Sequence, residues 1–574
     1  MGRDTFREVL LEGRRLLQDE KHEEALHAFD KAVDLNPLNP GNAIAFRGKG
    51  AALLRLDRHE DALQAFESAI ELNPKDAVAW RGKGYALITL DRLKESAHAL
   101  DTAIDLDPDN PTAWTNKGHV LVELGMPHEA LQASNKAISL NRENAVAWRA
   151  KGAALQKLRK HDQALQAFNE AIGLSPRDAD ALQGKGATLL ELDRPEEALE
   201  ALSNAIALES SNAASWRDNG TALLKLDRHR EALQAFDKAV GLLPNDAYSW
   251  SKKAHLLAVL DRPHEALRAC TKATDLNPRD AGAWRGKGAT LRRLGRHEEA
   301  LRALDKTIEL EPEDAVAWQG KGLALLEMER FDDALQALDK VVDLGAADAD
   351  TWGGKGRVLV TLGRHKEALQ ALDRAIELNP GNADAWTDRA IALGTLGQSE
   401  EMLQAFDKAT GLRPADAITW SSKAATLGTL GMYGEALPAC EKAIQLEPDD
   451  AVAWWGKGAG LLELGRHEEA LQALDRTIEL EPENGAAWQG RGLALLGLER
   501  YQEALQCLDE AADLKQEDVR SWRGRGLAFW KLKKYEEALR AFEKAVDLDP
   551  RDARSWQGRG LALLELKKYE EALQ

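Results

Sequence analysis

The sequence has 574 residues, of which 30% are charged and only 6% aromatic, and its formal net charge is −19. Such an acidic chain is a poor candidate for nucleic-acid binding through a broadly basic surface. Its 3 cysteines cannot build a disulfide framework, which favours a reducing compartment, and no stretch reaches the ~20 apolar residues that span a bilayer. We therefore expect a cytoplasmic protein that contacts neither nucleic acid nor membrane.

A 34-residue period organises the chain, and tryptophan marks it most clearly. Of the 16 tryptophans, all but two fall in one register, in which Leu182 takes one tryptophan slot. A fixed internal period of this length is typical of a repeat array. The column consists of Trp80, Trp114, Trp148, Trp216, Trp250, Trp284, Trp318, Trp352, Trp386, Trp420, Trp454, Trp488, Trp522 and Trp556.

Three ranges follow from this period in chain order. Residues 1–42 form a degenerate first unit with Val9 in the tryptophan slot and a three-residue excess around Pro40. Residues 43–552 hold fifteen 34-residue units, and residues 553–574 form a partial unit that ends inside its second helix. Repeat arrays need polar terminal caps, so we expect either a truncated chain or an open end that docks on something.

Each unit is expected to contain two amphipathic helices; positions below are counted from the tryptophan column. The first helix carries Trp and a Leu at +7 on one face, and it ends near +11. Residues such as Asp57 and Gly125 stand there, and both types tolerate left-handed backbone. The second helix carries Ala at +16, a large apolar residue at +20 and Ala at +23, and it ends before a Pro at +28.

These columns resemble the tetratricopeptide repeat family, and the resemblance covers essentially the whole chain. That family has a 34-residue helix–turn–helix unit with Trp, Gly, an aromatic residue or Leu, Ala, a large apolar residue, Ala and Pro in this order. The resemblance implies an all-α fold, a right-handed superhelical α-solenoid of antiparallel helix pairs. It also implies a non-catalytic scaffold without cofactors, which binds a protein or an extended peptide in a concave groove lined by the first helices.

The exposed positions +1 and +5 of the first helices are the expected contacts with such a partner. Two tryptophans outside the column, Trp455 and Trp530, join them because large aromatic side chains often anchor interfaces. Local packing explains either tryptophan equally well. The candidate partner-binding residues are Arg81, Tyr85, His119, Arg149, Arg217, His255, Arg285, Arg357, Trp455, Arg523 and Trp530.

Two other columns could be mistaken for a phosphate site. Gly-Lys-Gly, as at residues 82–84, lies within a helix and lacks the Ser or Thr of a P-loop, so its glycines indicate close helix contacts or an open groove wall. The +3 lysines form a ladder from Lys49 onwards. Either each stem packs between helices with its ammonium group paired to an acid, or the ladder is a cationic track for an acidic partner.

Histidine and cysteine columns are expected to be structural. The +13 histidines, such as His161, stand whole repeats apart, so they cannot converge on one metal ion and we expect them to pack between helices. Cys270, Cys440 and Cys507 occupy apolar slots of second helices, where buried thiols are expected. No catalytic or metal-binding residue is predicted.

Other functions remain open at this point. The array could be the sensor or regulatory arm of a larger signalling protein of the ATPase type. It could also be a structural solenoid that associates head to tail through its open C-terminal end. An enzyme would need chemistry on a loop insertion, and no repeat carries an insertion longer than three residues, so we expect no enzymatic activity.

Overall fold

The computed structural model describes residues 2–35, 41–514 and 518–572, with side chains from residue 5 onwards. Within these ranges the chain forms helices and turns and no strand. The excess expected around Pro40 lies partly outside the described residues. The chain divides into two compact units, Met1–Thr290 and Leu291–Gln574, and each is described by itself.

The first unit is built from α1 (Gly2–Gln18), α2 (His22–Leu35), α3 (Asn42–Arg55), α4 (His59–Leu72), α5 (Ala77–Thr89), α6 (Leu93–Leu106), α7 (Pro111–Glu123), α8 (Pro127–Leu140), α9 (Ala145–Lys157), α10 (His161–Leu174), α11 (Ala179–Glu191), α12 (Pro195–Leu208), α13 (Ala213–Lys225), α14 (His229–Leu242), α15 (Ala247–Val259), α16 (Pro263–Leu276) and α17 (Ala281–Arg293), in which the boundary falls.

The second unit continues with α18 (His297–Leu310), α19 (Ala315–Glu327), α20 (Phe331–Asp343), α21 (Ala349–Thr361), α22 (His365–Leu378), α23 (Ala383–Thr395), α24 (Ser399–Leu412), α25 (Ala417–Thr429), α26 (Tyr433–Leu446), α27 (Ala451–Glu463), α28 (His467–Leu480), α29 (Gly485–Gly497), α30 (Tyr501–Asp513), α31 (Val519–Lys531), α32 (Tyr535–Leu548), α33 (Ala553–Glu565) and α34 (Tyr569–Ala572).

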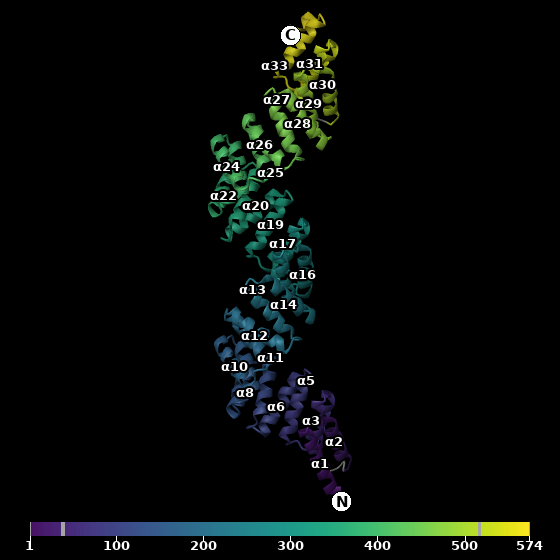
Figure 1. Cartoon of the computed structure of the whole chain (residues 1–574), viewed down its shortest axis with the longest axis vertical. Helices are drawn as coiled ribbons and strands as arrows, with labels where there is room; N and C mark the ends of the chain where they lie inside the picture. The colour runs from purple at the N-terminus through teal and green to yellow at the C-terminus, as the bar shows by residue number, and fades with distance from the viewer. Residues whose placement is uncertain (1, 36–40, 515–517, 573–574) are drawn as a thin grey trace. The chain divides into compact units, whose positions relative to one another are not determined.

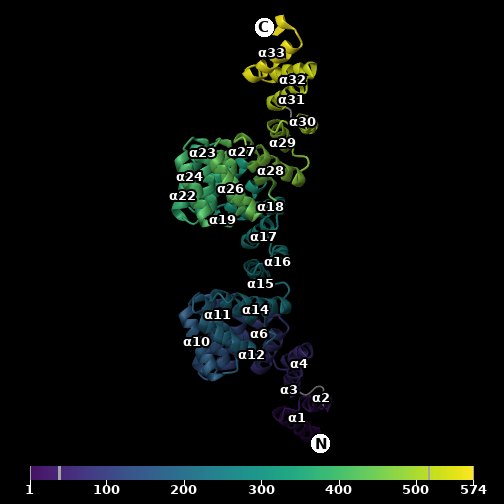
Figure 2. The ribbon, with the colours of Figure 1, turned by 45° about the horizontal axis from the view of Figure 1, so that its top comes forward.

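Helices pair in chain order throughout each unit (Figure 1). The odd-numbered helices are the first helices of successive repeats. Within each unit, apart from α17 at the boundary, a first helix packs against the second helix of its own repeat, as α21 does against α22. Second helices pack on the next first helix, as α22 does on α23, and first helices of neighbouring repeats also touch, as α29 and α31 do. The turned view in Figure 2 shows the same uninterrupted run of helices inside each unit. The predicted all-α architecture of helix pairs is confirmed.

Side chains and backbone conformation set both ends of the first helix. An Asp or Asn four residues before the tryptophan caps the helix: Asp76 accepts hydrogen bonds from the N–H groups of Val78 and Ala79. The predicted left-handed residues end it, with φ of 55° at Asp57 and 72° at Gly125.

The tryptophan column ties each first helix to the loop before it. The indole of Trp80 donates a hydrogen bond of 2.9 Å to the carbonyl oxygen of Pro74, six residues earlier. The same bond recurs in both units, for example from Trp250 to Pro244 and from Trp454 to Pro448. The indole therefore holds the connection between two repeats while its ring packs between helices.

The glycines of the Gly-Lys-Gly triplet make room for the large residue at +20. A Cβ atom on Gly82 would lie 2.4 Å from the ring of Phe66 in the preceding repeat, and one on Gly50 would lie 2.9 Å from the same ring on the other side. Phe66 is only 2% exposed. Two glycines from consecutive repeats thus pack against one aromatic ring, which confirms the close helix contacts predicted for this column. The contact explains why glycine stands inside these helices, although it is otherwise unfavourable there.

Candidate functional site

The cationic ladder at +3 is a packing and pairing element in most repeats. In the repeats that have both residues, the Lys or Arg lies over the tryptophan ring of its own repeat, 4.7 to 5.8 Å from the ring centroid. Most also pair with an acid on the preceding second helix: Lys83 Nζ lies 2.9 Å from Glu67, and Lys355 Nζ lies 2.6 Å from Asp339. In these repeats the ladder therefore follows the first of the two expectations, in which the stem packs between helices and the charged group pairs with an acid.

Three lysines of the ladder depart from this pattern. The acid sixteen residues earlier is replaced by Asn or Thr before Lys151, Lys185 and Lys287, and within the described ranges no ion pair forms at any of them. Burial lowers the pKa of Lys151. A continuous cationic track is therefore absent from the described repeats, and the unpaired charges are confined to the first unit.

Residues at +1 hold the next repeat in place. Arg47 Nη1 donates to both carboxylate oxygens of Asp76, at 3.0 and 2.8 Å, and Asp76 is the residue that caps the next first helix. Shorter side chains make the same link, as Ser421 does to Asp450 at 2.6 Å. This link, always between residues 29 apart, is called the cap bridge below. It recurs at Arg47–Asp76, Arg81–Asn110, Thr115–Asn144, Arg149–Asp178, Gln319–Asp348, Ser421–Asp450, Gln489–Asp518 and Arg523–Asp552.

Three predicted contact residues, Arg81, Arg149 and Arg523, are thus engaged within the fold. Arg149 also pairs with Asp180, and burial lowers the pKa of Arg81. Arg217 turns to Asp218 of its own helix, at 3.1 Å, and Arg285 is half-buried.

The remaining candidates differ in how far they reach solvent. Tyr85 is 46% exposed and Trp455 is 40% exposed, and His255 is also exposed. His119 is half-buried, and burial lowers its pKa. Trp530 is half-buried, and its indole nitrogen is buried with no acceptor among the described residues. Tyr85 and Trp455 therefore offer the most accessible large side chains of this set.

Three cavities open on the side formed by the first helices. One of about 310 Å³ is lined by His119 and Arg149 and lies along α7, α9 and α11. One of about 300 Å³ is lined by Arg357 and lies along α19, α21 and α23. One of about 450 Å³ is lined by Arg523 and Trp530 and lies along α29, α31 and α33. Five of the predicted residues therefore line cavities, each between first helices of three consecutive repeats.

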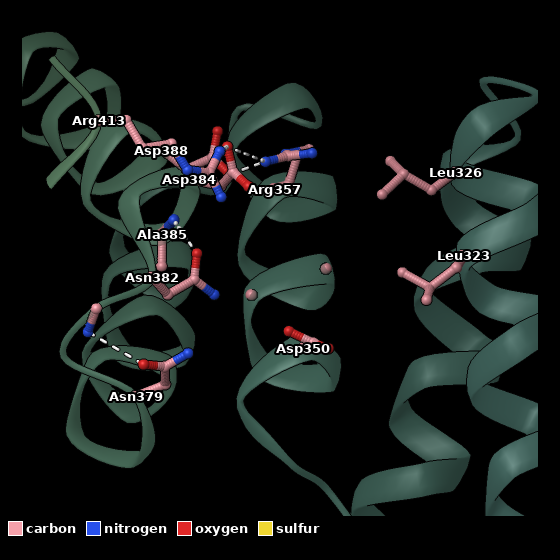
Figure 3. A pocket seen from close by; sticks show the side chains of 13 residues that line it. Leu323, Leu326, Asp350, Arg357, Asn379, Asn382, Asp384, Ala385, Asp388 and Arg413 are labelled. Atoms are coloured by element: carbon pink, nitrogen blue, oxygen red, sulfur yellow. Dashed lines mark hydrogen bonds and ion pairs between the residues drawn. The ribbon is translucent and has the colours of Figure 1, made fainter. Parts of the chain in front are cut away.

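The cavity at Arg357 is polar on one side and apolar on the other (Figure 3). Arg357 points toward Asp384 and Asp388, and its Nε donates a 2.9 Å hydrogen bond to Asp388. Leu323 and Leu326 face them from α19. Asp388 is 9% exposed, and burial raises its pKa even though Arg357 acts to lower it.

A second buried carboxylate stands 170 residues earlier. Asp218 is 8% exposed, and burial raises its pKa as well. It accepts hydrogen bonds from Gln183 at 2.6 Å and from Arg217 at 3.1 Å. Both acids occupy position +2, where Gly is the commonest residue.

The histidines and cysteines are structural. The ring of His467 packs so closely against α29 that a Cβ on Gly497 would lie 2.5 Å from it. All three thiols are free and buried, and burial raises the pKa of Cys270 and of Cys440 to about 11. In the part of the chain that the structure describes, no group of three or more His, Cys, Asp or Glu could hold a metal ion.

Family comparison agrees with the repeat geometry. One tetratricopeptide repeat model matches residues 10–77, 58–111, 184–247, 251–315, 290–350, 319–383, 354–417, 457–519, 490–553 and 523–574. The chain belongs to the tetratricopeptide repeat (TPR) family. Further models with the same description match residues 99–132, 145–178 and 429–479. Arrays of TPR units serve as scaffolds for protein–protein interaction, and this TPR array has that architecture.

Several solved structures are similar to parts of this TPR array. YrrB, a TPR protein with an unusual peptide-binding site, is 28% identical over 33% of this chain and 98% of its own, with a TM-score of 0.31. A TPR protein from Parabacteroides merdae is 16% identical over 44% and 99% of the two chains, with a TM-score of 0.36. PilF of Pseudomonas aeruginosa is 20% identical over 36% and 95%, with a TM-score of 0.33. Among curated proteins, no sequence matches this chain significantly.

Sequence reasoning missed two buried acids, of which Asp388 lines a cavity. Asp218 and Asp388 were not singled out, although a charged residue in a column dominated by Gly is a visible signal. The cap bridge was missed because it joins two repeats, so its 29-residue spacing is hidden behind the 34-residue period. No described helix is both long and apolar enough to cross a membrane.

Proposed function

We propose that this TPR array is a non-catalytic scaffold that binds a peptide or a partner protein along the face formed by its first helices. The observation that carries the proposal is that the three cavities described above all lie on that face, each between three consecutive first helices. Cavities of about 300 to 1,000 Å³ are the usual size of ligand sites. One further cavity, of about 610 Å³, lies along α22, α23 and α24 and is lined mostly by second-helix residues such as Ile376 and Gln404. Elsewhere the second helices carry exposed ion pairs such as Arg194–Glu197.

The exposed candidates would supply the contacts. Tyr85 and Trp455 project from first helices and have no role in a cap bridge. Arg81, Arg149 and Arg523 would touch a ligand while they hold the next helix cap, so their replacement would affect both binding and repeat packing. Trp455 is therefore the cleaner probe, because Ala is common on this face and suits a helix.

Selection of peptides on the full chain tests this function. Peptides from a random display library are selected, and a photo-crosslinking phenylalanine analogue is then placed at Tyr85 or at Trp455. Matched positions are Lys94 and Gln472, which are exposed on the second helices of the same two repeats. We expect crosslinks from the first-helix positions only. Crosslinking from Lys94 and Gln472 instead would contradict the proposal.

Replacement of one side chain adds a quantitative test. Trp455→Ala should leave the helical circular dichroism unchanged and weaken a peptide that crosslinks at this position about tenfold, since interface tryptophans commonly contribute more than about 1 kcal/mol. Gln472→Ala serves as the control. Equal affinities for the Trp455→Ala variant and the unmodified chain would exclude Trp455 as a contact.

A further inference from the structure

The cavity along α29, α31 and α33 differs in chemistry from the other two cavities on the same face. Its floor and walls are apolar: Phe542 is 4% exposed beneath it, and Leu493 and Leu496 close one side. Leu527 and Leu561 stand at the opening and are each 41% exposed. Large apolar side chains left open to solvent around a concavity are typical of an interaction site.

Glycines let the helix backbone pack directly on the apolar floor. A Cβ on Gly558 would lie 2.3 Å from the ring of Phe542, and one on Gly524 would lie 3.1 Å from Leu496. Both glycines line the cavity. The cavity wall at these two positions is therefore bare backbone, because any larger residue would have to displace Phe542 or Leu496.

The charged residues that line this cavity are all arginines. Arg520, Arg523 and Arg554 contribute to the lining, and no acid does. The cavity at Arg357 contains Asp350, and the one at His119 contains Glu123. In a chain with a net charge of −19, this is a local positive site.

One of the three arginines is available for pairing. Arg520 is held by Glu463 at 2.6 Å, and Arg523 is held by Asp552 at 2.9 Å. Arg554 is exposed, and no ion pair or hydrogen bond joins its side chain to the residues that the structure describes. Its guanidinium is therefore free to bind a carboxylate, which it can do through two parallel hydrogen bonds.

We propose that this cavity receives one bulky apolar side chain of an acidic peptide segment, which pairs a carboxylate with Arg554. The inference rests on the proposed function and specifies the partner at one part of the first-helix face. The apolar side chain supplies most of the affinity, because it leaves water for an apolar floor. The arginines supply selectivity against neutral and basic segments.

Three labelled peptides of twelve residues test the inference on the full chain by fluorescence polarisation. The first has one central Phe flanked by Glu residues, the second has Ser in place of Phe, and the third has Lys in place of Glu. The first should bind at least about tenfold more tightly than either of the others. Its affinity should also fall as salt is raised, because exposed charge pairs are screened. Equal binding of the first and third peptides would overturn the proposal.

Variants locate the binding on the protein. Arg554→Glu and Leu527→Ser should each weaken the first peptide about tenfold without a change in circular dichroism. Arg540→Glu, the same charge reversal on the exposed side of α32, and Ile418→Ser, which replaces an apolar residue that is 72% exposed on α25, should have no effect. Unchanged affinity for Arg554→Glu would show that the peptide binds elsewhere.

Two outcomes separate this inference from the proposed function. If the first peptide does not bind while library-selected peptides still crosslink at Tyr85, only the ligand assigned to this cavity is wrong. If sedimentation equilibrium shows a dimer that Arg554→Glu abolishes and the first peptide does not bind, the occupant is a second copy of this chain, and the acidic-peptide assignment fails.

Discussion

Two regions that stand 170 residues apart bury a carboxylate at the same repeat position and neutralise it in different ways. In the first unit, Asp218 is held by Gln183 from the preceding repeat and by its neighbour Arg217. In the second unit, Asp388 is held by Arg357. The residue that corresponds to Gln183 is Gly353, and Arg357 stands where the first unit has Ala.

The comparison shows how a cavity arises in a repeat array without any change in the backbone pattern. At Asp218 a hydrogen bond comes from Gln183, at +1 of the preceding first helix. At Asp388 that +1 position is Gly353, and the partner comes from +5, one turn further along the same helix. Gly353, which has no side chain, lines the 300 Å³ cavity.

The largest effect is expected from removing the single partner of Asp388. Arg357→Ala leaves a carboxylate that is 9% exposed without its ion pair, which should destabilise α23 by about 2 to 3 kcal/mol, because an uncompensated buried charge is costly. Hydrogen exchange of α23 amides, measured by mass spectrometry, reports this loss.

The first region supplies the control for that loss. Arg217→Ala leaves Asp218 with its 2.6 Å hydrogen bond from Gln183, so α13 should lose less than about 1 kcal/mol. Equal losses of protection in α13 and α23 would mean that Asp218 and Asp388 depend equally on their arginines, which would contradict the difference described above.

Smaller effects, of opposite sign in the two regions, are expected at Gly184 and Gly354. These glycines occupy position +2 one repeat before Asp218 and Asp388. A Cβ on Gly184 would lie 2.4 Å from the buried ring of Phe168, whereas one on Gly354 would lie 3.2 Å from Leu323. Gly184→Ala should therefore cost about 1 kcal/mol net, the strain exceeding the helix preference of Ala. Gly354→Ala should be neutral or stabilise by up to about 1 kcal/mol.

Protection of α11 and α21 amides measures the two glycine effects in the intact chain. A stabilised α11 in the Gly184→Ala variant would show that Phe168 moves without cost. The close contact of Gly184 with Phe168 would then not explain why the two glycine substitutions are expected to differ.

The smallest effect concerns pH. Burial raises the pKa of Asp388 above its ordinary value near about 3.9, so the folded state holds this proton more tightly than the unfolded state. The resulting destabilisation is absent below the ordinary pKa and grows as the pH rises through the raised value, by about 1.4 kcal/mol for each unit of elevation. Asp388→Asn removes this dependence.

We therefore expect the protection of α23 in the unmodified chain, relative to the Asp388→Asn variant, to decline as the pH rises above the ordinary aspartate pKa and to level off once the pH has passed the raised pKa. Asp218→Asn should give a change of the same sign in α13, since burial also raises the pKa of Asp218. If the protection of α23 in the unmodified chain instead rises with pH relative to the Asp388→Asn variant, the effect of Arg357 on the pKa of Asp388 outweighs the effect of burial.

The repeating elements could be predicted from the sequence because their residues recur at a constant spacing in nearly every repeat. The period alone places the left-handed turn at Asp57, the end of the second helix before Pro74 and the close packing of Gly82. The paired Lys83 was also within reach, because its acid lies one helix away at a constant offset.

The candidate site was predicted less well, because it depends on side chains that vary from repeat to repeat and on how each of them meets its neighbouring repeat. Arg81 and Arg523 occupy exposed positions on an isolated helix, and only the neighbouring repeat brings a cap residue within hydrogen-bond distance. The burial of Asp388 likewise results from packing of three first helices. Exposure estimated from one repeat therefore overstates how many of its side chains are free to bind a ligand.

The cap bridge also has a mechanical consequence. It connects the N-terminal cap of one first helix to a side chain on the first helix of the preceding repeat. A pulling force therefore passes from repeat to repeat through this side-chain link as well as through the backbone. Gly353 has no side chain to form this link, and the indole of Trp455 cannot accept a hydrogen bond from the amide of Asn484 as the Thr115 hydroxyl does from Asn144. Resistance to stretching therefore differs from one repeat to the next, and a single substitution at +1 changes how firmly two neighbouring repeats are held together.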